Sequence, residues 1–198
     1  MITIRRARAG DAAAIGAVHV AAWRSAYAGI LPDAYLTRMS VSRQALHYDA
    51  TIRAGLGVHV ATASGLDLGV SGRGPRIIGF VTGGPAREGN AAIHAPMHGP
   101  MHGLGDGEIQ TLYVLDDWRD RGIGRRLMRA AAAHLVTIGC RSAFLWVLRD
   151  NPSRWFYTRL GGKPVAEATV HVGGAPVVQT AYGWAPIERL AEATSKAS

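Results

Sequence analysis

The stretch that decides the fold is EIQTLYVLDDWRDRGIGRRL, which spans residues 108–127. It begins as an apolar strand, passes through an acidic and arginine-rich turn, and enters an amphipathic helix at Gly122. A glycine-rich turn at the start of a helix aims several free backbone N–H groups at one point, and the helix dipole adds positive potential there. The stretch therefore predicts a site for a pyrophosphate group.

The elements around this turn form one supersecondary unit. Residues 109–115 predict a strand, and apolar residues at helical spacing predict a helix over 122–137 that ends at Gly139. The continuous apolar run AFLWVL, residues 143–148, is typical of a strand covered on both faces. Strand, helix and strand in this order predict a parallel β-α-β unit with a right-handed crossover. The expected buried face of the helix comprises Ile123, Leu127, Ala131, Leu135 and Ile138.

The rest of the chain adds elements on both sides of this unit, without a repeat or a domain boundary. Asn151-Pro152 predicts the start of a further helix, and two strands joined by Gly173-Gly174 suit a hairpin. Residues after Glu192 are expected to be frayed. The elements expected before the unit are a strand over 3–7, helices over 11–22 and 42–54, and strands over 58–63 and 77–83.

The bulk composition indicates a folded and basic protein. Of the 198 residues, 48% are hydrophobic and 18% are charged, and the formal net charge is +8. No apolar run reaches about 18 residues, and the N-terminus lacks the apolar core of a signal peptide. We therefore expect a soluble, cytoplasmic protein that does not bind membranes. The single cysteine, Cys140, rules out an intrachain disulfide.

Arginine carries almost all of the positive charge, and much of it gathers after residue 118. A basic balance suits anionic partners such as nucleic acid, anionic lipid or a phosphorylated cofactor. Clustering around one turn favours a local phosphate site over nucleic acid. The clustered residues are Arg119, Arg121, Arg125, Arg126, Arg129, Arg149, Arg154 and Arg159.

Two common nucleotide-binding motifs do not fit the turn. Leu127 stands where the dinucleotide fingerprint has its third glycine, and no acidic residue ends a following strand at the usual distance. The Gly-Lys-Ser/Thr of a P-loop is also missing after the turn.

The turn resembles the acetyl-coenzyme A signature of the GCN5-related N-acetyltransferase (GNAT) superfamily, which is Gln/Arg-x-x-Gly-x-Gly/Ala after a strand. Arg119-x-x-Gly122-x-Gly124 matches it, and 146–161 resembles the family's asparagine-then-Phe-Tyr helix. The resemblance implies a single-domain α/β GNAT fold over 1–190 with a C-terminal tail over 191–198. Its sheet would be mixed and mostly antiparallel around a central parallel β-α-β unit.

The resemblance also implies acetyl-CoA as the co-substrate. The strand before the turn would run beside the pantetheine arm, and the turn would hold the pyrophosphate. The alternative role for Asn151 is to cap the following helix, and the alternative for the arginines is a solvent-exposed face without cofactor contacts. The family often has Gly-Phe where this chain has Gly161-Gly162, so an aromatic support is lost there. The implied cofactor-binding residues are Leu112, Tyr113, Val114, Arg119, Arg121, Gly122, Ile123, Gly124, Arg125 and Asn151.

Two residues are candidates for proton transfer in amine acetylation. The resemblance makes Tyr157 the general acid that protonates the departing thiolate; packing beside Phe156 is the alternative reading. An alkylammonium of pKa about 10.4 costs about 4–5 kcal/mol to deprotonate at pH 7, so a base or a water chain would help. Glu108, at the start of the central strand, is the candidate base; an exposed strand-end charge is the alternative reading.

The acceptor is expected to be a small-molecule or peptide amine. Trp23 and Tyr27, with nearby Asp33 and Tyr35, resemble the family's acceptor region, although core packing is the better explanation for each residue taken singly. The amine would attack acetyl-CoA directly in a ternary complex. A homodimer is compatible with this reading.

Two other functions stay open: an acyl-CoA sensor that binds without turnover, and a basic nucleic-acid-binding module. A metal site is not expected. His94, His98 and His102 recur at every fourth residue, but the prolines and glycines of the connector 84–107 oppose the helix that would align them. We expect this connector to be a mobile loop.

Overall fold

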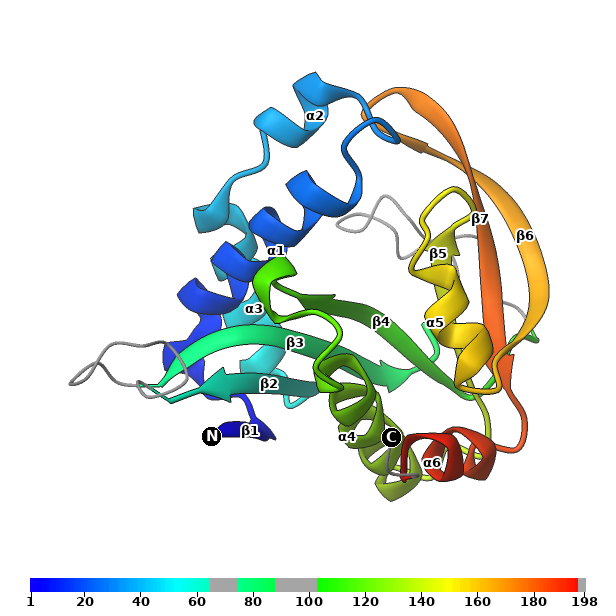
Figure 1. Cartoon of the computed structure of the whole chain (residues 1–198). Coiled ribbons are helices and arrows are strands. Elements are labelled where there is room, and N and C mark those ends of the chain that lie inside the picture. The colour runs from blue at the N-terminus through cyan, green and yellow to red at the C-terminus, as the bar shows by residue number, and fades with distance from the viewer. Residues whose placement is uncertain (65–74, 88–102, 196–198) are drawn as a thin grey trace.

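A seven-stranded sheet with the strand order β1-β2-β3-β4-β5-β7-β6 runs through the protein. The structure is a computed structural model, and it describes residues 1–64, 75–87 and 103–195 (Figure 1). Strands β4 and β5 are parallel, and every other neighbouring pair is antiparallel. The predicted mixed α/β fold with one central parallel β-α-β unit is confirmed.

The predicted elements are all present, and most boundaries differ by one to three residues. The strands are β1 (Ile2–Arg6), β2 (Gly57–Ala63), β3 (Arg76–Pro85), β4 (Gly107–Val114), β5 (Ala143–Leu148), β6 (Lys163–Val172) and β7 (Ala175–Trp184). The helices are α1 (Ala12–Ala26), α2 (Asp33–Thr37), α3 (Val41–Arg53), α4 (Ile123–Thr137), α5 (Arg154–Arg159) and α6 (Glu188–Ser195). Two short 3-10 turns are η1 (Ala9–Asp11) and η2 (Asp116–Trp118).

Helices cover both faces of the sheet. Ile77 and Phe80 of β3 pack in the cluster with α1 and α3, whereas Ile78 and Val81 pack in the cluster with α4. A register shift against β2 at this point interrupts the simple alternation of sides along β3. Figure 1 shows α1 and α3 on one face and α4 with α6 on the other. Each fully buried leucine or isoleucine in these layers contributes about 1.5–3 kcal/mol of transfer free energy.

The two parallel strands separate soon after they pair. Their register contains two pairs of residues, Gly107 with Ala143 and Glu108 with Phe144. Beyond them β4 stays paired with β3 as far as Val114, and β5 follows β7. The sheet therefore opens into a fork between the two central strands, which Figure 1 shows.

Three sequence predictions need correction. Helix α1 runs four residues past Ala22, because no glycine or proline lies between Ala22 and Gly29, whose φ is +76°. Ile138 is 42% exposed because α4 ends one residue before it. The expected frayed tail is helical as far as Ser195, since α6 buries Leu190 and packs against α4.

No helix in the described part of the chain has the length and apolar character that a membrane span requires.

Candidate active site

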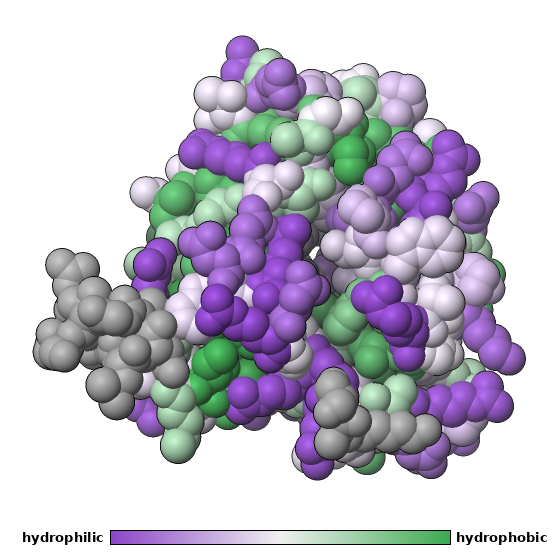
Figure 2. Space-filling model, in the orientation of Figure 1, coloured by the Kyte–Doolittle hydropathy of each residue, from purple (hydrophilic) through white to green (hydrophobic). Residues whose placement is uncertain are grey.

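The fork between β4 and β5 opens into a cavity of about 890 Å³. Its wall combines β4 and β5, the start of α4, helix α5 and the inner face of α1. Figure 2 shows hydrophilic side chains gathered over the start of α4, beside a hollow that separates them from α5. The cavity therefore brings together segments from both halves of the sequence.

The turn before α4 has the backbone of an anion-binding helix start. Gly122 adopts the left-handed conformation, with φ +70°, and Asp120 also has a positive φ of 59°. The Arg126 N–H donates to the Gly122 carbonyl as the first bond of the helical ladder, so the N–H groups before it lie outside that ladder. Gly122, Ile123 and Gly124 line the cavity. The predicted phosphate turn thus faces the same space as the fork.

Gly124 meets a close-packing requirement as well. A Cβ built there would lie 3.3 Å from the Phe156 ring of α5. A larger residue would push α5 away from the turn, whereas Gly122 has open space and needs its freedom only for the positive φ. The two glycines therefore serve different purposes.

Nine of the ten residues predicted to bind the cofactor line the cavity, and Arg121 is the exception. The Arg121 guanidinium lies over the Trp118 ring, 4.9 Å from its centroid. Arg119 lines the cavity and forms an ion pair with Asp116 at 2.8 Å. Both partners are more than 40% exposed, so the pair contributes little stability.

Tyr157 lies buried in the cavity wall on α5. Burial, together with the nearby Tyr27, raises the pKa of its phenol above the ordinary value. The phenol is therefore protonated across the physiological pH range. Its surroundings suit a group that holds a proton until an anion forms beside it.

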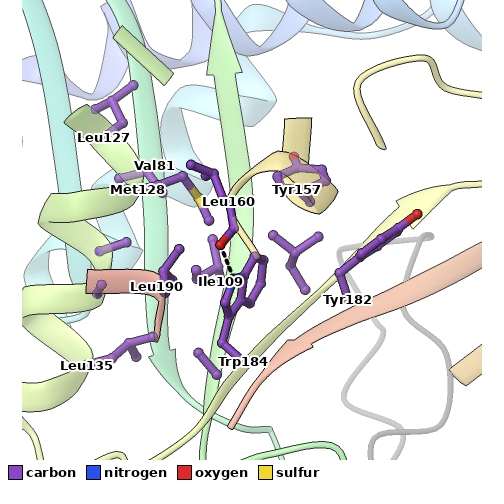
Figure 3. Packing of buried hydrophobic residues seen from close by; sticks show 14 of the residues in the cluster. Val81, Ile109, Leu127, Met128, Leu135, Tyr157, Leu160, Tyr182, Trp184 and Leu190 are labelled. Atoms are coloured by element: carbon purple, nitrogen blue, oxygen red, sulfur yellow. Dashed lines mark hydrogen bonds between the residues drawn. The ribbon is translucent and has the colours of Figure 1, made fainter. Parts of the chain in front are cut away.

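Trp184 of β7 packs at the end of α5, where this chain has Gly162 instead of the family's frequent phenylalanine. The Trp184 Nε1–H donates to the Leu160 carbonyl at 2.8 Å, as Figure 3 shows. A Cβ on Gly162 would lie 2.7 Å from the Trp184 ring and 2.9 Å from the Tyr157 carbonyl oxygen. Glycine at 162 thus leaves room for an indole that comes from β7.

Asn151 combines a capping contact with a place on the cavity wall. Its Oδ1 accepts a hydrogen bond from the Ser153 N–H at 2.9 Å, and the residue is buried. A hydrogen bond with Asn151 also lowers the pKa of Tyr27, which burial raises overall to about 12. Asn151 therefore connects the start of α5 with α1.

Glu108 does not join this group. Its carboxylate is buried at the closed end of the fork, where the Arg87 guanidinium donates to both oxygens at 2.9 and 2.6 Å. Glu108 is absent from the described residues that line the cavity. The geometry separates it from Tyr157 and the phosphate turn.

Trp23 and Tyr27 both line the far end of the cavity, and Tyr35 joins them; Asp33 is exposed on α2 outside it. His19 and Tyr48 also line this end of the cavity and were not expected from the sequence. The Tyr48 hydroxyl lies 2.7 Å from His19 Nδ1. The signal for His19 was its spacing of four residues from Trp23 on one helix face.

Trp146 on β5 also lines the cavity, and its buried Nε1 has no hydrogen-bond partner among the described residues. The three histidines weighed as metal ligands, His94, His98 and His102, lie outside the described residues. So does residue range 88–102 of the connector that was expected to be a mobile loop.

Comparison with known proteins agrees with this architecture. The model of the acetyltransferase (GNAT) family matches residues 30–162. The uncharacterized N-acetyltransferase YuaI of Bacillus subtilis (strain 168) is 29% identical over 190 residues, with 96% of each chain covered.

Two solved structures share the fold at 18% identity and a TM-score of 0.63. One is yncA from Salmonella typhimurium with its cofactor acetyl-CoA, where 93% of this chain and 94% of that chain are covered. The other is Arabidopsis thaliana NAA60 in complex with a bisubstrate analogue, with 93% and 98% covered. Because the family model spans most of the chain, the fork and the glycine turn belong to a known architecture, and the protein is a member of the acetyltransferase (GNAT) family.

Proposed function

We propose that the protein transfers an acetyl group from acetyl-CoA to a primary amine, which attacks the thioester directly in a ternary complex. One observation carries the proposal: a single cavity joins the start of α4, the open edge of β4, Tyr157 and the aromatic face of α1. Membership of the GNAT family and the acetyl-CoA bound to the Salmonella yncA protein support the choice of donor.

The donor would occupy the fork and the phosphate turn. Its pyrophosphate would accept hydrogen bonds from backbone N–H groups at the start of α4, where the helix dipole favours negative charge. The pantetheine arm would lie along Leu112–Val114, whose edge faces the fork, and pair with it as an added strand does.

The acetyl carbon would then be attacked by the neutral amine. The new C–N bond forms, the carbonyl oxygen becomes negative, and a backbone N–H near Val114 would stabilise it. When the tetrahedral intermediate collapses, the C–S bond breaks and the Tyr157 hydroxyl donates its proton to the thiolate. Burial disfavours the resulting phenolate as it does a thiolate, so the proton released by the attacking nitrogen must return through water in the cavity to Tyr157. The step then ends with a neutral amide, a neutral thiol and a neutral phenol.

A structural role fits Glu108 better than the role of base. Arg87 occupies both carboxylate oxygens, so we assign the amine proton to water in the cavity. A covalent acetyl-enzyme is not needed. Cys140 is buried near Gly107, and burial raises the pKa of its thiol, which disfavours a thiolate nucleophile.

Ligand-induced thermal shift is the first test. Acetyl-CoA should raise the Tm, whereas NAD and ATP at the same concentration should not, and amide signals of residues 121–125 should move in NMR spectra. Release of free CoA with a panel of primary amines then tests turnover. Unmoved amide signals overturn the donor site, and binding without CoA release on any amine would identify a sensor instead.

A further inference from the structure

Helix α1 presents a row of aromatic rings to the cavity. His19, Trp23 and Tyr27 are spaced by four residues and therefore share one face of the helix. The His19 ring stacks on the Trp23 ring with centroids 5.3 Å apart, and Tyr27 meets Trp23 edge-on at 4.9 Å. These separations are those of well-packed aromatic pairs.

Three more rings complete the enclosure. Tyr113 of β4 lies 5.2 Å from His19 and 6.5 Å from Trp23, measured between centroids. Tyr48 of α3 lies 5.7 Å from His19, and Tyr35 of α2 lies 6.1 Å from Trp23. We call the six cavity-lining residues His19, Trp23, Tyr27, Tyr35, Tyr48 and Tyr113 the aromatic chamber.

The six rings of the aromatic chamber carry no charge at neutral pH. Burial lowers the pKa of His19 to about 3, so its ring is neutral. Burial raises the pKa of Tyr27 to about 12 and raises the pKa values of Tyr48 and Tyr113 above the ordinary value. The arginine and aspartate side chains that line the cavity, namely Arg119, Asp120, Arg125 and Arg159, belong to the phosphate turn, α4 and α5.

The chamber is held in shape from outside. The tip of the β6–β7 hairpin reaches α2 (Figure 1), and a Cβ on Gly173 would lie 2.7 Å from the Cβ of Tyr35. Val172 of β6 is fully buried in the same apolar cluster as Trp23 and Tyr27. Rings fixed in this way lose little entropy when a ligand binds against them.

The chamber also adjoins the reacting groups. The pKa of Tyr27 responds to hydrogen bonds with Tyr113 and Asn151, and Tyr27 in turn raises the pKa of Tyr157. Tyr27 is thus the member of the chamber that lies near Tyr157, the proposed general acid, and both residues line the cavity.

We propose that the acceptor is a primary alkylamine that bears an aromatic ring, bound with its ring in the aromatic chamber and its nitrogen beside Tyr27. The inference rests on the proposed function and specifies its substrate. Offset and edge-on ring contacts favour such a body, whereas a second ammonium group would lose its hydration against uncharged walls. The same loss of hydration lowers the pKa of the attacking amine, which must be neutral to react.

The test compares amines at saturating acetyl-CoA, with release of CoA as the readout. We expect kcat/KM for 2-phenylethylamine to exceed that for 2-cyclohexylethylamine about tenfold, and that for 1,4-diaminobutane by more. A short peptide with a free N-terminus should be a poor acceptor. Equal rates for the phenyl and cyclohexyl amines, preference for the diamine or the peptide, or no turnover of 2-phenylethylamine would each overturn the inference.

Variants locate the preference within the chamber. Trp23→Leu should lower kcat/KM for 2-phenylethylamine about tenfold, and the half-buried Tyr35→Leu should lower it several-fold if Trp23→Leu fails to fold. Leu46→Ala, 74% exposed on α3, is the control that should change nothing. An unaltered phenyl preference in a folded chamber variant contradicts the inference. If acetyl-CoA does not raise the Tm of the wild-type protein, that result contradicts the proposed function instead.

Discussion

The two halves of the cavity are built in different ways. The donor half, the open edge of β4 with the phosphate turn and the start of α4, comes from one continuous stretch, residues 110–125. The acceptor half collects its rings from α1, α2, α3 and β4. A family can therefore keep the donor half as one motif, while the acceptor half changes by substitution at scattered positions.

The largest expected effect tests the residue at the junction of the two halves. Tyr157→Phe should lower kcat about 10²–10⁴-fold, the usual contribution of a general acid, because the thiolate would lose its proton donor. The Kd of acetyl-CoA should stay within about twofold. Steady-state kinetics and calorimetry measure the two quantities.

Tyr182→Phe is the matched control for this change. Tyr182 is a buried tyrosine on β7 whose ring lies 6.1 Å from that of Tyr157, and it is not among the residues that line the cavity. Its variant should keep the wild-type kcat. Equal losses in both variants would mean that Tyr157 acts through packing.

The ion pair between Arg87 and Glu108 at the closed end of the fork should affect the stability of the protein, whereas Tyr157 at the open end should affect catalysis. Arg87→Met should lower the free energy of unfolding by about 3 kcal/mol, because it removes the ion-pair partner of a buried carboxylate. Urea unfolding measures this loss. The double variant Arg87→Met/Glu108→Leu should recover much of it and retain kcat. A folded Glu108 variant with kcat reduced a hundredfold would restore the role of base.

Donor binding should depend on close packing at the turn. Gly124→Val should weaken acetyl-CoA binding, since the new side chain crowds the Phe156 ring of α5 at the turn, and overpacking of this kind costs about 1–3 kcal/mol of stability. Titration calorimetry gives the affinity. Gly10→Ala, with no atom within 4 Å of the added Cβ, serves as the control. Tight binding by the valine variant would show that α5 can shift without cost to the donor half.

The smallest effect concerns a histidine pair outside the cavity, between β2 and α4. Burial, His134 and Arg6 lower the pKa of His59 to about 4, so the folded state favours the neutral ring. This contribution to stability is complete above pH 6.5 and is lost as the pH falls towards 4. Its size is about 1–2 kcal/mol, since the group is partly exposed.

His59→Leu should therefore flatten part of the fall in stability between pH 6.5 and 4, with kcat unchanged. Because the pKa of His19 is also lowered, to about 3, its protonation likewise reduces the stability of the protein as the pH falls. The quantity to measure is therefore the difference in stability between the variant and the wild type. Parallel curves for the two proteins would contradict the assignment.

The sequence predicted best what depends on neighbours along the chain. The β4-α4-β5 unit, its approximate boundaries and the turn at Gly122 follow from periodicity and glycine chemistry within residues 107–148. Helix α6 was missed because its stability comes from burial of Leu190 against α4, which no local pattern reports.

The candidate site shows the same difference between residues that are close in the sequence and residues that only the fold brings together. Nine of the ten expected cofactor residues line the cavity, and eight of the nine do so because strand, turn and helix start are contiguous; Asn151 comes from the segment before α5. Glu108 was misjudged as accessible because its partner Arg87 lies 21 residues away, across a connector without periodicity. Tyr35 was expected from the resemblance to the family's acceptor region, whereas Tyr48 carried no sequence signal, since only the fold brings α3 to α1.

The brief pairing of β4 with β5 has a mechanical consequence. Two pairs of residues join a four-stranded part of the sheet to a three-stranded part, which makes this the shortest strand pairing in the sheet. A ligand that contacts both parts binds only while they are held together, so it should stabilise the folded protein against unfolding in proportion to the logarithm of its concentration.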